Sequence, residues 1–251
     1  MVVGILLCSF ASLNKRPDTV RKVVIDAGHG GFDPGCLGQF SKEKDVAMDI
    51  ALETGRLISL FHEDVEVIYT RKKHNQFVTL RNRALIANRS HADLFISIHC
   101  NAHPVKKIYG TETYVMGLSS SEENLAVAMR ENAVILQEED YQDNYAGFDP
   151  SSPVSHILLA NLQQAYQERS ISLATKIEEQ FGQRTGRTSR GVKQAGFLVL
   201  AKTAMPSVLV ETGFLTNADE EKFLNSDKGK ARVASGVYRA FRDYKKELEA
   251  N

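Results

Sequence analysis

The stretch VVIDAGHGGFDPG, from Val23 to Gly35, decides how the rest of the chain is interpreted. An apolar run ends at Ala27, and His29 follows it among glycines and two aspartates. The glycines have neither the GxGxxG nor the GxxxxGK[ST] spacing of a nucleotide-binding loop. They let the backbone coil tightly instead, which presents His29 at the carboxyl end of a buried strand. In open α/β sheets, functional sites are built at that edge.

Strands and helices alternate along the chain on either side of His29. Apolar runs predict strands at 22–27, 65–70, 93–99, 111–116, 196–200 and 207–211. Helical periodicity predicts helices at 43–60, 79–88 and 233–248. This alternation predicts an α/β fold with a mostly parallel sheet that is covered by helices on both faces.

Residues 119–191 interrupt the alternation, because they contain no convincing apolar strand. Helical patterns run through 122–138 and 154–181, and turn-forming residues join them at Gly147 and Pro150. We interpret 119–191 as a helical insertion within one domain that spans residues 21–251.

The composition and the N-terminus limit the classes of partner. Lys and Arg together number 31, as do Asp and Glu, so the zero net charge predicts no nucleic-acid partner. The apolar run at residues 2–10 is too short for a transmembrane span. It is similar to the apolar part of a secretory signal, so we interpret residues 1–20 as a candidate signal segment and expect export. A lipid on Cys8 and a buried N-terminal strand are the alternatives.

Three more polar residues stand where this fold would bring them toward His29. His99 ends one predicted strand, Glu43 opens the first predicted helix, and Glu211 closes the last predicted strand. Two histidines with two carboxylates are the inventory of a catalytic zinc site, which uses three protein ligands and a glutamate that accepts a proton. Glu43 is also typical of an acid favoured by a helix N-terminus. A carboxylate that ends an apolar strand, as Glu211 does, is costly unless it is paired or functional.

The other candidate ligands have simpler interpretations. Cys100 follows His99 directly, and neighbouring strand residues face opposite sides, so the two are not expected to bind one ion. The remaining histidines are interpreted as hydrogen-bonded to loops: His62, His74, His91, His103 and His156.

Four motifs, in this order, resemble the zinc-dependent N-acetylmuramoyl-L-alanine amidase family of cell-wall enzymes: IDAGHGGFDPG, SKEKDVAMDIA, YTRKKHNQFVTLRNRALIANRSHADLFISIHCNA and AMPSVLVETGFLTNADEEKFL. The resemblance covers nearly everything from Lys22 onward and implies a twisted mixed sheet flanked by helices. It makes His29, Glu43 and His99 the ligands of Zn²⁺ and Glu211 the catalytic glutamate. The loop from His29 to Glu43 is one residue shorter than the family's commonest form.

The helical insertion resembles one found in the division-associated branch of these amidases. In that branch, a helix lies over the zinc and blocks substrate until an activator protein displaces it. The matching stretch is SSSEENLAVAMRENAVILQEED, in which Glu131 is the candidate for zinc's open position and Glu138 and Glu139 compete with it. The other interpretation is a helix whose acids face water. The resemblance implies a peptidoglycan substrate, an activator protein and a periplasmic location.

The activity implied is hydrolysis of the amide bond between N-acetylmuramic acid and L-alanine, in cell-wall remodelling and daughter-cell separation. One alternative is a catalytically silent peptidoglycan-binding or regulatory module, which such intact candidate residues do not favour. A second alternative is a zinc peptidase that acts within the stem peptide, which would share the same metal site.

Overall fold

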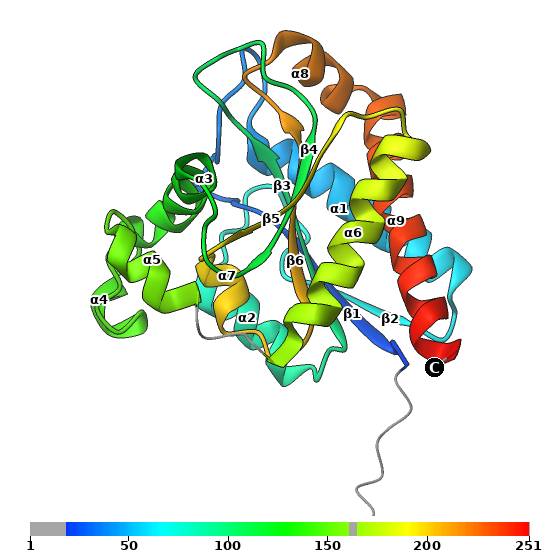
Figure 1. The fold of residues 1–251 in the computed structure, drawn as a ribbon, viewed down its shortest axis with the longest axis horizontal. Helices are drawn as coiled ribbons and strands as arrows, with labels where there is room; N and C mark the ends of the chain where they lie inside the picture. The colour runs from blue at the N-terminus through cyan, green and yellow to red at the C-terminus, as the bar shows by residue number, and fades with distance from the viewer. Residues whose placement is uncertain (1–18, 161–164, 251) are drawn as a thin grey trace, which may run out of the picture.

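A six-stranded sheet crosses the centre of the molecule in the computed structural model, which describes residues 19–160 and 165–250 (Figure 1). The strands are β1 (Lys22–Ala27), β2 (Glu66–Tyr69), β3 (Leu94–Asn101), β4 (Thr111–Met116), β5 (Ser189–Ala195) and β6 (Ser207–Phe214). Their order is β2–β1–β3–β6–β4–β5, and neighbours are parallel except β4 and β6. The predicted mostly parallel mixed sheet is confirmed.

One face of the sheet is covered by three long helices, α1 (Glu43–Phe61), α6 (Gln167–Gln183) and α9 (Asp227–Ala250) (Figure 1). Alternate strand residues such as Ile25, Ile96 and Val210 are buried beneath them, together with Phe181 and Phe241 of the helices. The short helix α8 (Ala218–Asn225) precedes α9 and packs against it.

The opposite face carries shorter elements, which are α2 (Leu80–Arg89), α3 (Glu122–Asn132), the 3₁₀ turn η1 (Ala133–Gln137), α4 (Tyr141–Asn144), α5 (Pro153–Ala160) and α7 (Leu198–Ala201). The other set of strand residues, including Val24, Phe95 and Leu209, packs here against Ala128 and Phe197. Burial on both faces explains why the central strands read as continuous apolar runs. Helices on both faces are therefore confirmed.

The predicted elements are wrong between residues 189 and 200. The run at 196–200 was expected to be a strand, but it leads into α7, because a short buried apolar run does not distinguish a strand from a helix. The true edge strand, β5, begins at Ser189, at the end of the stretch expected to lack strands, and continues beyond it to Ala195. Its sequence, SRGVKQA, is mostly polar and only partly buried, so it carries no apolar signal.

The helical stretch predicted at 154–181 divides between the two faces of the sheet. Its first part forms α5 beside α3, whereas its second part forms α6 on the far face against α9 (Figure 1). The part of 119–191 that covers the face of α3 therefore runs from α3 to α5.

The candidate signal segment at residues 1–20, with Cys8, lies outside the described residues except for Thr19 and Val20. Among the described helices, none is long and apolar enough to cross a membrane.

Candidate active site

His29 lies two residues beyond the end of β1, in a strained backbone turn. Its φ of 58° is in the left-handed region that residues other than glycine rarely adopt. Arg83 of α2 holds this turn by donating from Nη2 to the His29 carbonyl at 2.6 Å. The Nδ1 atom of His29 is 2.7 Å from Asp33 Oδ2, so Nε2 is left facing His99 and Glu43. A side chain at Gly28 would collide with the His99 ring, 2.4 Å from an added Cβ, so glycine is required there.

Glu43 is the first residue of α1, as predicted, and it is fully buried. Its Oε2 accepts a hydrogen bond from the Cys36 amide at 2.8 Å, and its Oε1 accepts one from the Cys100 amide at 2.9 Å. Oε1 also lies 3.1 Å from His29 Nε2 and 3.0 Å from His99 Nδ1. Two backbone amides therefore fix the carboxylate against both imidazoles.

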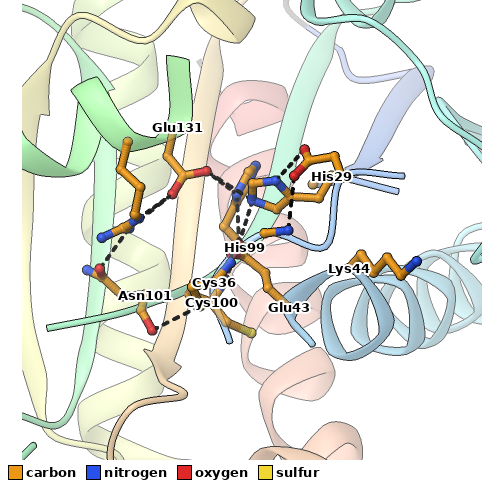
Figure 2. Close-up of polar contacts among 12 residues, drawn as sticks. His29, Cys36, Glu43, Lys44, His99, Cys100, Asn101 and Glu131 are labelled. Carbon is orange, nitrogen blue, oxygen red and sulfur yellow. Dashed lines mark hydrogen bonds and ion pairs between the residues drawn. The ribbon is translucent and has the colours of Figure 1, made fainter. Parts of the chain in front are cut away.

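Glu131 of α3 reaches the same point from above the sheet (Figure 2). Its Oε2 lies 3.0 Å from His29 Nε2 and 3.2 Å from His99 Nδ1. Ligand atoms of His29, Glu43, His99 and Glu131 all lie within 4.8 Å of one another, and all four residues are buried. The competing Glu138 is elsewhere, where it accepts a hydrogen bond from Tyr145.

The chemistry of this cluster fits a metal cation. His29 Nε2 and Glu131 Oε2 are buried and face each other without a hydrogen bond. Imidazole nitrogens and carboxylate oxygens are the ligand atoms that zinc takes in catalytic sites. Burial lowers the pKa of His99, but Glu131 and Glu43 raise it to about 9. A cation at this point would thus replace protons that the carboxylates otherwise hold on the imidazoles.

Glu211 lies beside the cluster, in the register of β6 that pairs it with His99 on β3 and with Glu112 on β4. The prediction that it ends its strand is wrong, because pairing continues beyond it as far as Phe214. Both carboxylate oxygens of Glu211 are buried without a hydrogen bond. Burial and the charges of Glu131 and Glu43 raise its pKa well above the usual range. Such a group is typical of a residue that exchanges protons during catalysis.

Arg130, next to Glu131 on α3, was missed by the sequence analysis. Its guanidinium donates to Glu131 Oε1 at 3.0 Å, to Asn101 Oδ1 at 3.0 Å and to the Ala102 carbonyl at 3.2 Å. Its Nη2 also lies 3.7 Å from Glu211 Oε1. This cation therefore holds α3 on the strand end and offsets two of the carboxylates.

A second missed feature is the buried polar network beneath the site. Asp26 of β1 pairs with Arg83 at 2.9 Å and accepts hydrogen bonds from Ser97 at 2.6 Å and Thr70 at 2.5 Å. Burial alone would raise the pKa of Asp26, but these three partners lower it. The network anchors the strand end from which His29 projects.

The remaining candidate ligands lie apart from the cluster. Cys100 packs into the core on the face of α1, opposite to His99, as strand alternation predicts. His103 accepts a hydrogen bond from the Val105 amide, and buried His156 contacts the Pro150 carbonyl at 3.0 Å.

A His/Glu cluster that could hold a metal ion, at the strand ends of an α/β sheet and beside a buried carboxylate with a raised pKa, is typical of metal-dependent hydrolases. A model of the N-acetylmuramoyl-L-alanine amidase family matches residues 23–243. The chain belongs to this family of peptidoglycan hydrolases, which is generally metal-dependent.

The similarity to known relatives covers most of the chain. The chain is 30% identical over 227 residues to N-acetylmuramoyl-L-alanine amidase AmiA of Escherichia coli K12. The aligned region spans 89% of this chain and 75% of that protein. The crystal structure of an amidase from Clostridium difficile 630 has 25% identity and a TM-score of 0.67, over 90% of this chain and 97% of that one. The CwlD amidase of Clostridioides difficile, solved in complex with the GerS lipoprotein, has 25% identity and a TM-score of 0.66, over 89% and 98%.

Proposed function

We propose that this chain is a zinc-dependent amidase that cleaves the bond between N-acetylmuramic acid and L-alanine in peptidoglycan. The observation that carries the proposal is the convergence of His29, Glu43 and His99 beside Glu211, whose carboxylate is buried without a hydrogen bond. We propose the first three as zinc ligands and Glu211 as the catalytic glutamate.

Each proposed ligand is oriented by a partner of its own. Asp33 fixes the ring of His29, backbone amides fix Glu43, and the missing side chain at Gly28 leaves room for the ring of His99. Outer partners of this kind set the tautomer and orientation of metal ligands. When bound, zinc supplies a Lewis acid that polarises the scissile carbonyl and lowers the pKa of water to about 7.

Glu211 has the position and the proton affinity for a general base. It adjoins His99 on the neighbouring strand, and burial with the charges of Glu131 and Glu43 raises its pKa, so it takes up a proton more readily than an ordinary glutamate. In the proposed reaction, Glu211 takes a proton from the attacking water and then gives it to the departing amine of L-alanine. The C–N amide bond breaks, and the muramoyl carboxyl group keeps the oxygen of the water.

We further propose that the structure is an autoinhibited state in which Glu131 occupies the position that water and substrate need. Its Oε2 faces both imidazoles, at 3.0 Å and 3.2 Å, so it would complete the ligand set of the cation. Arg130 and the apolar contacts of α3 hold it there. Movement of α3 would remove Glu131 and expose the site.

An activator protein is the proposed cause of that movement. The complex of the CwlD amidase with the GerS lipoprotein supports a protein partner for amidases of this family. Next to α3, the helix α5 exposes Val154, Ile157 and Leu158, which offer such a partner an apolar contact. The resemblance of the helical segment to the division-associated branch of the family is the basis on which we propose a role in daughter-cell separation and an exported, periplasmic location.

The test is a digest of purified cell-wall sacculi by the zinc-loaded chain and by its Glu131→Ala variant, with products identified by mass spectrometry. We expect whole stem peptides with a free L-alanine amine, released faster by the variant and not released after chelation. Cleavage within the stem would identify a peptidase instead. If neither protein releases peptides, the amidase proposal fails and the catalytically silent peptidoglycan-binding module is the remaining interpretation.

The point substitution is preferable to deleting residues 120–165, although deletion is also expected to raise activity if the segment blocks the site. That segment contributes Val127, Ala128, Ile135 and Leu159 to the core on its face of the sheet. Their loss would uncover Phe197, so a deleted chain could lose activity by unfolding.

A further inference from the structure

A cavity of about 320 Å³ opens beside the cluster of His29, Glu43, His99 and Glu131, between α3 and the β4–β5 edge of the sheet. Its lining includes Asn101 and Arg130, which also belong to the surroundings of the cluster. The sheet supplies the residues that give it chemical character, which are Glu112, Tyr114, Arg190, Lys193 and Phe214. The zinc chemistry proposed above uses none of these five.

Two cations in this cavity share one buried carboxylate. Arg190 Nε and Lys193 Nζ, both from β5, each lie 2.6 Å from Glu112 Oε1. Glu112 is 2% exposed, and its other oxygen accepts hydrogen bonds from Asn101 and Tyr114. Burial would raise the pKa of Glu112, but Lys193 and Arg190 lower it, so it stays ionised. Two positive charges and one negative charge leave this part of the lining with one positive charge in excess.

The register of the sheet places Arg190 and Lys193 close to Glu211, the proposed catalytic glutamate. Glu112 pairs with Glu211 across β4 and β6, and side chains paired in this way have Cβ atoms about 5 Å apart. The charged ends of Arg190 and Lys193 reach back to Glu112 from the next strand. A peptide residue extends about 3.4 Å, so the cations are within one or two residues of an amide held at Glu211.

The charges on the helix that covers the cavity indicate the charge of a ligand that would bind in it. Glu122 and Glu123 of α3 line the cavity opposite the strands, so acids of the covering helix lie over the cationic floor. When α3 moves, its acids and Arg130 leave together, whereas Glu112, Arg190 and Lys193 remain on the sheet. The open floor would then attract an anion.

We propose that this cavity is the subsite for the leaving peptide, and that Lys193 and Arg190 bind a carboxylate within one or two residues of the scissile amide. The inference rests on the proposed function, because the stem peptide is the leaving group of that reaction. The carboxylate of the peptide would balance the one positive charge that Glu112, Arg190 and Lys193 leave in excess. The ring of Phe214, 5.5 Å from the Arg190 guanidinium, gives the peptide an apolar wall. The covering helix would thus close the peptide subsite and the metal cluster together.

The test is direct binding of two dipeptides that differ in one group. L-Alanyl-γ-D-glutamate carries a free carboxylate, and its α-amide does not. Isothermal titration would compare the two ligands on the unmodified chain and on Glu131→Ala. We expect the acid to bind about tenfold or more tightly than the amide to Glu131→Ala, because a charged hydrogen bond is lost in the amide. Lys193→Met should remove this preference and Lys193→Arg should keep it.

The matched control is Lys246→Met in the same background, which removes an exposed lysine of α9 on the opposite face. It should keep the full preference for the acid. Equal binding of acid and amide, or a preference that survives in Lys193→Met, would overturn the subsite. A lower melting temperature of Lys193→Met with an unchanged preference would instead show a purely structural cluster.

The binding readout separates this inference from the proposed function. A chain that prefers the acid but releases nothing from sacculi would contradict the amidase proposal alone. An active amidase with no preference would contradict the subsite alone.

Discussion

Asp33 controls the orientation of His29 through the 2.7 Å contact between its Oδ2 and the ring Nδ1. We expect Asp33→Asn to weaken zinc affinity about 10- to 100-fold, as losses of outer partners of metal ligands do. Competition with a chromophoric chelator would measure it. Asp219→Asn, an exposed change on α8, is the control and should bind zinc like the unmodified chain. Equal affinities of the two variants would show that Asp33 does not position the ligand.

Glu211 and His29 should fail in different ways when they are substituted. Glu211→Gln preserves shape, so we expect normal zinc content and turnover lower by roughly 10²-fold or more, since a proton acceptor is lost. His29→Ala should lose the metal itself. Zinc content by mass spectrometry and peptide release from sacculi, both in the Glu131→Ala background, would distinguish them. Near-normal turnover of Glu211→Gln would remove that residue from its proposed role.

Asp26 links the stability of the fold to pH. Its pKa is lower in the folded chain than in the unfolded chain, so as the pH falls the unfolded chain takes up the proton first. Its stabilisation is therefore complete above its ordinary pKa, near 4, and is lost as the pH falls through the lower folded value.

The corresponding variant is Asp26→Asn, which leaves buried Arg83 without its carboxylate. We expect a loss of about 3 kcal/mol or more in the free energy of unfolding at pH 7, and a smaller difference at pH 3.5. Urea unfolding at both pH values would measure it. The exposed Asp143→Asn should change little at either pH. A difference that grows toward acid would contradict the lowered pKa.

At the scale of elements, α3 carries Arg130 and Glu131 at adjacent positions, and the two side chains make different contacts. Arg130 attaches the helix to Asn101 and Ala102, and Glu131 enters the cluster. We expect Glu131→Ala to raise the rate of peptide release several-fold or more without an activator, because the position at the imidazoles is freed. Glu139→Ala, which removes an exposed acid near the end of the same segment, should not. Equal rates for both variants would contradict autoinhibition by Glu131.

Elements with a strong apolar pattern could be predicted from the sequence, and weakly patterned ones could not. β4 was expected at 111–116 and is found there, and α1 begins at Glu43 as expected. The polar edge strand β5 was missed, because one sheet edge needs little apolar burial. α7 was mistaken for a strand because its residues are buried on all sides.

The same distinction holds for the site. His29 and His99 could be predicted to meet because parallel strands end at one edge of a sheet, and a helix begins at Glu43 nearby. Contacts that depend on how a covering helix packs on the sheet cannot be predicted from the spacing of residues in the sequence. Arg130 is one such case. Lys193 meets Glu112 across β5 and β4, and this contact could not be predicted because β5 itself was missed.

At the scale of the molecule, the cluster joins both layers of helices to the sheet. Glu43 comes from the helix on one face, Glu131 comes from the helix on the other, and His99 comes from the strand between them. Zinc bound there would stabilise the whole fold by about 4 kcal/mol at 1,000 times its dissociation constant. We expect melting temperatures roughly 10 °C lower after chelation.

Differential scanning fluorimetry with zinc and with a chelator would measure this shift. His29→Ala should melt at the same temperature under both conditions. A shift of equal size in that variant would place the stabilising metal elsewhere.

The position of β6 has a consequence for the order in which the enzyme is assembled. This strand is the last of the strands in the described residues, yet it lies between β3 and β4 at the centre of the sheet. A growing chain that has emerged as far as β5 contains His29, Glu43 and His99, but its sheet still lacks the strand that joins its two halves. Glu211 arrives on that joining strand. The proposed proton acceptor therefore arrives in the same step that completes the sheet, so we expect an unfinished chain to lack amidase activity.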